Sequence, residues 1–157
     1  MNYANWLVDV PSEITNDPIW KLEVYRLGLF AGDIGLQDAL LLMKKPLMLS
    51  IADQLHRSID SISVNLTEGY SRSKGLDRAR FIEASLGSAR ESRDWYYKSR
   101  HVLPTEVIKH RMGLTTRIVS MLAPMIPHQR KHAIREEQAE YNTQSSGFSL
   151  DSEVPFP

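Results

Sequence analysis

Apolar residues recur at intervals of three and four along most of the chain, which is the spacing of one face of an α-helix. The pattern is broken by proline and glycine, which end helices or favour turns, at Asp17-Pro18, Lys45-Pro46, Ser73-Lys74-Gly75 and Leu103-Pro104. No stretch alternates apolar and polar residues long enough to predict a strand. The pattern predicts four helices, near residues 17–43, 46–72, 76–102 and 104–123.

Short connections between the predicted helices require neighbouring helices to run antiparallel. We therefore expect an all-α protein, an antiparallel up-down-up-down four-helix bundle with a flexible C-terminal tail. Residues 1–16 form an N-terminal extension, and residues 17–126 form the bundle. Residues 127–157 are polar and rich in Ser, Gly, Asn and Pro. They are expected to be largely disordered, with one or two helical turns through Glu140.

The second predicted helix has a polar stripe directly beside its apolar one. Its members are Ser58, Ser61, Asn65 and Glu68. Small and polar residues next to a core favour close helix packing with a few hydrogen bonds that fix the register. The glycines of the first helix, at positions 28, 32 and 35, predict fraying, a kink or close backbone approach there.

The third predicted helix carries small residues on the face that also holds Phe81 and Trp95. These are Ser85, Ser88, Ser92 and Ser99, with Gly87 and Ala89 beside them. Such a face lets a neighbouring helix approach closely. We expect Trp95 to enter the core and to leave Tyr96 or Tyr97 at an interface. The alternative is an aromatic and basic surface that stacks on nucleic-acid bases.

The fourth predicted helix has two adjacent apolar rows. They are Val107, Leu114, Ile118, Met121 and Met125, and Ile108, Met112, Val119, Leu122 and Ile126. Two rows exceed what one small bundle core requires, so we expect the surplus to face another subunit.

Composition limits the classes of function. The 157 residues include no cysteine, which excludes disulfides, a thiol nucleophile and cysteine-ligated metals. No secretory signal is visible at the start, and the longest apolar stretch is too short to cross a bilayer. We expect a cytoplasmic protein that has no membrane partner.

Charge is balanced overall but unevenly placed. Residues 1–56 hold four Lys and Arg against seven Asp and Glu, residues 57–117 hold twelve against seven, and residues 118–157 hold three against five. The middle of the chain is therefore basic, between acidic ends. Either these charges pair with one another on solvated helix faces, or the surplus forms a patch for an anionic partner.

Candidate catalytic and metal-binding residues are few. Glu68 beside Asn65 could act as a base or metal ligand, but the structural interpretation is that both satisfy hydrogen-bond donors and that Arg72 pairs with Glu68. His128 and His132 have a spacing that suits a metal, although solvated side chains explain them equally. Nucleophile-elbow, phosphate-loop and Glu-x-x-His motifs are missing. We expect no catalytic centre, metal or cofactor.

Two motifs resemble those of a known family. The first is Arg57, Ser61-Ile62, Asn65, Glu68-Gly69 and Arg72, and the second is Phe81, Gly87-Ser88 and Glu91. Together they resemble the bacterial four-helix bundle family, which includes ribosomal RNA intervening-sequence proteins and the accessory variability determinant proteins of diversity-generating retroelements. The resemblance extends from Trp20 to about Leu122. Ser58 and Ser63 depart from it, at positions where the family often has alanine and proline.

This resemblance implies a ring-shaped homo-oligomer of five copies, contacts with RNA or DNA, and assistance to a reverse transcriptase. The local charges indicate where nucleic acid would bind through its phosphates. The candidate residues are Arg72, Lys74, Arg78, Arg80, Arg90, Arg93, Lys98 and Arg100. A protein–protein scaffold that binds no nucleic acid is the alternative.

Overall fold

A computed structural model describes residues 2–72, 75–129 and 155, and all regular structure in these residues is helical. The all-α prediction is confirmed. The elements in chain order are α1 (Tyr3–Asp9), α2 (Ser12–Thr15), the 3₁₀ turn η1 (Pro18–Lys21), α3 (Glu23–Leu42), the 3₁₀ turn η2 (Pro46–Met48), α4 (Leu49–Tyr70), α5 (Gly75–Ser99), α6 (Thr105–Leu122) and α7 (Met125–Gln129).

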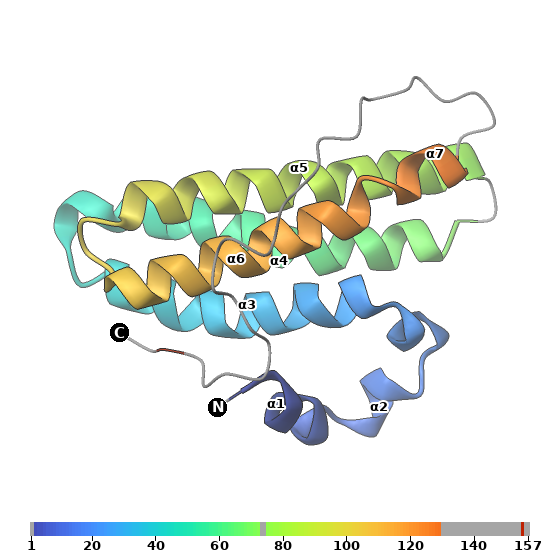
Figure 1. Ribbon diagram of the computed structural model, residues 1–157, viewed down its shortest axis with the longest axis horizontal. Coiled ribbons are helices and arrows are strands. Elements are labelled where there is room, and N and C mark those ends of the chain that lie inside the picture. Colours follow the sequence, from blue (N-terminus) through green and yellow to red (C-terminus); the bar gives the residue numbers. More distant parts are fainter. Residues whose placement is uncertain (1, 73–74, 130–154, 156–157) are drawn as a thin grey trace.

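The four long helices, α3 to α6, lie side by side in a bundle (Figure 1). Each packs on the next along the chain, and α6 also packs on α3. Their shared core consists of side chains with almost no exposed surface. The largest are Phe30, Leu27, Ile34, Leu42, Leu55, Ile59, Ile62, Tyr96, Leu114, Ile118 and Leu122. These apolar side chains fall at the three-four spacing that predicted the helices.

The predicted helix limits are right to within a few residues, except at the start of the first helix. Asp17 caps the turn as expected, because its side chain accepts a hydrogen bond from the Ile19 amide at 3.0 Å. Pro18 then opens η1 rather than the long helix. Leu22, with ψ at 110°, is extended and separates η1 from α3.

The glycines of α3 mark close approach to α4. A Cβ placed on Gly28 would lie 3.1 Å from Ile62 Cγ2, and one on Gly35 would lie 2.9 Å from Ile59 Cδ1. The helix nevertheless continues unbroken to Leu42. Of the three effects predicted for these glycines, close backbone approach is therefore the one that occurs.

Residues before the bundle complete its core. Tyr3 and Trp6 of α1 are buried, and the Trp6 ring lies 5.4 Å from that of Phe30 on α3. The Trp6 indole also donates a hydrogen bond to Asp33 at 2.6 Å. This contact holds α1 against the outer side of α3 (Figure 1).

Both apolar rows of α6 are used within one protomer, so the prediction that one row is surplus is wrong. Val107, Leu114 and Ile118 of the first row are buried, and so are Ile108, Val119 and Leu122 of the second. The methionines and Ile126 are partly buried against the same core. Since α6 packs on both α3 and α5, each row has a helix to cover it.

The small-residue face of α5 is also internal, because α4 covers it. Ser85 donates a hydrogen bond to the Ile62 carbonyl at 2.8 Å, and the Ser92 and Ser58 hydroxyls are 3.0 Å apart. Gly87 does not belong to this contact: it is exposed, and a Cβ there would meet no described atom within 4 Å.

The described part of α7 ends at Gln129. The helical turns predicted through Glu140 and most of the predicted disordered tail lie outside the described residues. None of the described helices is long and apolar enough to cross a membrane.

Candidate nucleic-acid interface

The polar motif of α4 makes its hydrogen bonds mainly within the helix. Ser61 donates to the Arg57 carbonyl at 2.7 Å, and Asn65 donates to the Ser61 carbonyl at 2.7 Å. Glu68 is exposed, and Arg72 lies over the Phe81 ring, 5.1 Å from its centroid. The predicted Glu68–Arg72 ion pair is therefore not formed in the described part of the chain.

Gly69 is the motif residue that most directly shapes the fold. A Cβ at this position would lie 2.8 Å from the Phe81 Cβ on α5, which is closer than real Cβ atoms pack. The predicted close packing at Gly69 is thus observed. In the second motif, Ser88 donates to the Ala84 carbonyl at 3.0 Å, and Glu91 accepts from the Trp95 indole at 3.1 Å.

The eight basic candidates do not form one cluster. Lys74 lies outside the described residues. Arg78 and Arg100 stand near opposite ends of α5, and 22 residues at about 1.5 Å each separate them by roughly 33 Å. The basic residues therefore have to be considered by their position along α5 and by the side of the helix they occupy.

At the start of α5 the basic side chains contact the protein itself. Arg78 donates to the Arg72 carbonyl at 2.9 Å, and Arg80 lies 3.7 Å from Asp77. With Arg72 stacked on Phe81, these cations brace the connection between α4 and α5. They form a weaker candidate for an anionic partner than the sequence suggested.

The second half of α5 carries a more coherent basic row, which we call the arginine stripe. It consists of Arg90, Arg93, Tyr97 and Arg100, at spacings of three and four that place them on one side of the helix. The Arg100 guanidinium lies 3.9 Å from the Tyr97 ring centroid and donates to the Tyr97 carbonyl at 2.7 Å. Tyr97 is 53% exposed, so an aromatic ring and a cation are presented together.

Arg80 and Lys98 project from a different side of α5. They are separated by 18 residues, or five helical turns, and so share a side that lies away from the arginine stripe. Acidic Glu91 is on this side too. Lys98 sits 3.9 Å from the centroid of the Trp95 ring.

Trp95 is only partly buried, and fully buried Tyr96 takes the core position predicted for it. Periodicity could not choose between the two neighbours. Tyr96 enters because its hydroxyl finds an acceptor inside the bundle, the carboxylate of Asp38, at 3.0 Å.

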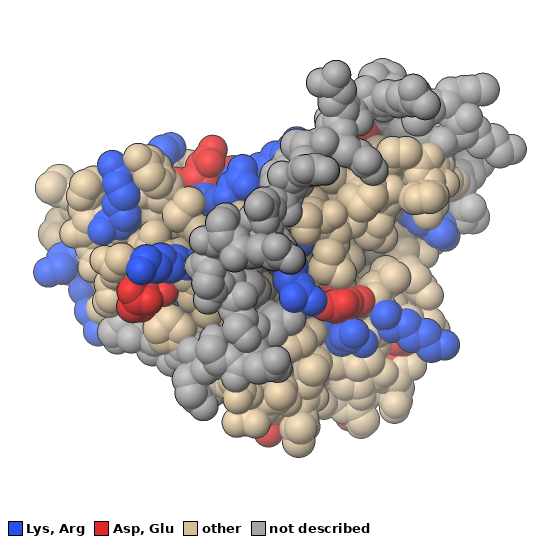
Figure 2. All heavy atoms as spheres, in the orientation of Figure 1, with Lys and Arg blue, Asp and Glu red and all other residues tan. Residues whose placement is uncertain are grey.

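The surface agrees with a divided charge pattern. Figure 2 shows Lys and Arg groups along the edge where α5 runs and at the end where α5 turns into α6, with acidic groups between them. On the described part of this face the basic groups do not merge into one continuous patch. Any anion-binding surface of a single protomer is therefore narrow.

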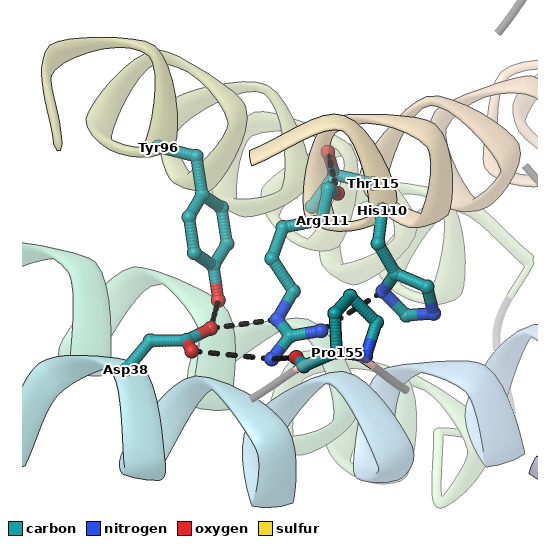
Figure 3. Close-up of polar contacts among 6 residues, drawn as sticks. All are labelled: Asp38, Tyr96, His110, Arg111, Thr115 and Pro155. Carbon is teal, nitrogen blue, oxygen red and sulfur yellow. Dashed lines mark hydrogen bonds and ion pairs between the residues drawn. The ribbon is translucent and has the colours of Figure 1, made fainter. Parts of the chain in front are cut away.

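A second polar constellation, inside the bundle, was missed by the sequence analysis (Figure 3). Asp38 of α3 and Arg111 of α6 are both fully buried and form a two-point ion pair, with Nε to Oδ2 at 2.6 Å and Nη2 to Oδ1 at 3.1 Å. Tyr96 of α5 donates to the same carboxylate. Arg111 also donates to the Pro155 carbonyl at 2.9 Å, which brings the end of the chain against the bundle.

His110 completes this buried cluster. Its Nδ1 lies 3.0 Å from Nη1 of Arg111, and because arginine only donates, Nδ1 must accept. The ring is then neutral, with its proton on Nε2. Burial and the neighbouring Arg111 charge lower the pKa of His110 to about 4.

Burial also sets the protonation of the other two groups. It raises the pKa of the Asp38 carboxyl, while the hydrogen bonds and charge of Arg111 oppose that rise. Burial and the Asp38 charge raise the pKa of Tyr96 well above its ordinary value. Every polar group of the cluster is thus engaged with another, an arrangement that links three helices and orients side chains.

A signal for this cluster is present in the sequence. Asp38 comes four residues after Ile34 and four before Leu42, and Arg111 falls between Val107 and Leu114 in the first apolar row of α6. A charged residue inside an apolar row predicts a buried partner of opposite charge. Which residue that partner is depends on how the helices pack.

Among the described residues, no three His, Asp or Glu side chains come close enough together to hold a metal ion. His132, one of the two histidines with metal-like spacing, lies outside those residues.

Comparison with known proteins supports the resemblance. The sequence model of the 23S rRNA-intervening sequence protein family matches residues 41–124, just over half of the 157 residues. The chain belongs to this family. The match spans η2, α4, α5 and α6, and therefore both motifs and every basic candidate. No curated protein and no solved structure matches the chain.

The family match begins at the last two residues of α3. The helices α1 and α2 and almost all of α3 therefore precede the matched span. Asp38, one half of the buried ion pair, lies before it, while Arg111 lies within it.

Proposed function

We propose that this protein is a non-enzymatic RNA-associated accessory factor that contacts phosphates through the arginine stripe of α5. The family match supports an association with ribosomal RNA intervening sequences, and the stripe is the observation that carries the choice of surface. Its three arginines and an exposed tyrosine follow one side of the helix. Arginine pairs well with phosphate, and an exposed aromatic ring can stack on an unpaired base.

The chemistry of the stripe favours binding with little sequence specificity. Phosphate contacts position a nucleic acid but do not read its bases. One protomer offers only a few such contacts. The ring of five copies implied by the family resemblance would repeat the stripe around the assembly, so that weak contacts add up.

A titration of single-stranded RNA and of duplex DNA at two salt concentrations tests the proposal. We expect the wild-type protein to bind RNA at low salt and to lose affinity as salt rises. The double variant Arg93→Glu/Arg100→Glu should bind about tenfold more weakly, with a salt dependence reduced by about one phosphate per lost contact.

The matched control is Arg80→Glu/Lys98→Glu. It makes the same change of charge on another side of the same helix and should weaken binding much less. Equal losses in the two double variants would mean that net charge alone governs binding and would overturn the stripe. Failure of the wild-type protein to bind RNA even at low salt would overturn the function itself. Circular dichroism checks that each variant is folded.

The resemblance to accessory variability determinant proteins extends the proposal to a reverse transcriptase of a diversity-generating retroelement as the protein partner. The lack of cysteine is compatible with action in the cytoplasm. Co-purification of a reverse transcriptase with the tagged protein from its native cells would support this partner. A partner-free preparation from cells that express such an enzyme would contradict it.

A protein scaffold that binds no nucleic acid is the second candidate, and the mixed charges on the Arg80–Lys98 side of α5 favour it. Such a surface suits a polar protein interface better than a phosphate backbone. Capture of a defined protein that survives nuclease treatment, together with no RNA binding in the titration, would select the scaffold.

A further inference from the structure

The outer side of α3, opposite the core, carries a second row of apolar residues. Leu22, Leu29, Leu36 and Met43 recur every seven residues, and Leu40 joins them four residues after Leu36. A repeat of this kind is typical of a helix that packs on another helix along that side. The row runs from just before α3 to just beyond it.

The first half of this row is already covered by the chain itself. Leu22 and Leu29 are partly buried against the core cluster. Trp6 of α1 donates to Asp33, and Arg26 donates to the Trp20 carbonyl at 3.0 Å and lies over the Trp20 ring. The N-terminal segment thus supplies the packing partner for this half.

The second half of the row is exposed. Leu36, Leu40 and Met43 are all open to solvent, Leu40 at 49%, and Leu47 in η2 continues the same end of the helix at 96% exposed. We call these four residues the open stripe. Contiguous exposed apolar side chains on one helix face are typical of an interaction surface. Lys44 and Lys45, both exposed, border it.

The same chain carries a surface that complements the open stripe. The segment from α1 to η1 exposes Val8, at 84%, and Ile14. Beside them are exposed Asp9, Glu13 and Asp17. One surface is therefore apolar with a basic border, and the other is apolar with an acidic border.

We propose that the open stripe of one copy docks on the α1–α2 segment of a second copy. Apolar contacts between Leu40 and Val8 neighbourhoods would supply the affinity, and Lys44 and Lys45 opposite Asp9 and Glu13 would set the orientation. Within a protomer, α1 already packs on the first half of the same row, so the inter-copy contact continues a mode of packing that the fold uses. This inference does not depend on RNA binding.

Sedimentation of the full chain at micromolar concentration, without nucleic acid, tests the contact. The wild-type protein should self-associate, and Leu40→Glu should weaken association at least about tenfold, because a carboxylate would be buried in an apolar contact. Val64→Glu is the matched control, since Val64 is 53% exposed on α4, away from the open stripe. It should leave association unchanged.

A charge swap tests the orientation. Lys44→Glu/Lys45→Glu should weaken association, and adding Asp9→Lys/Glu13→Lys to the same chain should restore it. A monomeric wild-type protein, or a Leu40→Glu variant that associates normally, would overturn the contact. So would a loss of association in Val64→Glu equal to that in Leu40→Glu. If the charge swap fails to restore association, the α1–α2 segment is not the occupant and the proposal is wrong.

Discussion

The contact between α4 and α5 and the contact between α3 and α6 are both buried, but they are built from different chemistry. Between α4 and α5 the polar groups are neutral: the hydroxyls of Ser58, Ser85 and Ser92 lie beside the close approach at Gly69. Between α3 and α6 the central contact is the Asp38–Arg111 ion pair.

These two solutions differ in what they demand of their surroundings. A serine hydroxyl can turn back to a carbonyl of its own helix, so losing its cross-helix partner leaves little unsatisfied. A buried carboxylate without its arginine has no such alternative and must either stay unpaired or take up a proton. The charged contact therefore fixes how the helices pair, whereas the neutral contact mainly lets them come close.

The largest expected effect follows from breaking the ion pair on one side. Arg111→Met leaves the Asp38 carboxyl buried beside Tyr96 and should lower the free energy of unfolding by about 3–5 kcal/mol. The double variant Asp38→Asn/Arg111→Met removes the orphaned charge and should recover part of that loss. Urea unfolding of the two variants and of Asp38→Asn provides the cycle. A loss in Arg111→Met no larger than that of a surface substitution would contradict the role given to the pair.

A change of pH should separate the two contacts without altering the α4–α5 interface. The pKa of His110 is lowered to about 4 in the folded protein, so between pH 6.5 and 4 the unfolded chain takes up a proton that the folded one does not. The free energy of unfolding should therefore fall with pH across this window, by at most about 3 kcal/mol. Urea unfolding at pH 7, 5.5 and 4 measures the fall.

His110→Gln is the control for this pH dependence, because its amide oxygen can still accept from Arg111 and does not titrate. The raised pKa of Asp38 acts in the opposite direction, since the folded protein then binds a proton more readily than the unfolded chain as pH falls. A pH dependence that survives unchanged in His110→Gln would show that another group is responsible.

The smallest effect is expected at the neutral contact. Ser85→Ala removes one hydrogen bond to the Ile62 carbonyl, which also accepts the backbone bond of its own helix, so the loss should be about 1 kcal/mol. Ser88→Ala, whose hydroxyl bonds only within α5, should cost less still. If Ser85→Ala destabilised the protein as much as Arg111→Met, the distinction between the two contacts would fail.

Much of the fold could be predicted from the sequence because helix periodicity is local. The breaks before Pro46 and Pro104 and the small-residue faces of α4 and α5 could all be identified without coordinates. The prediction failed where the outcome depended on a distant neighbour. The second row of α6 is covered by another helix of the same chain, and Tyr96 replaces Trp95 in the core because Asp38, 58 residues away, accepts its hydrogen bond.

The candidate interface shows the same limit. The sequence identifies which residues are basic, but the side of α5 that each one occupies and the partner it already contacts come from the packed structure. Arg72 and Arg78 were assigned to an anionic partner, yet they contact Phe81 and a backbone carbonyl. Arg93 and Arg100 remained on the side that the structure leaves for a partner.

The sequence by itself determined that this chain is helical, where its long helices begin and end, and which family it resembles, because each of these depends on the spacing of nearby residues. Only the tertiary structure decided which buried charges pair, which apolar rows are covered and which half of the outer row of α3 stays open. Those outcomes depend on contacts between residues far apart in the chain, and the free energy of burying a charge or an apolar row is set by what lies across from it.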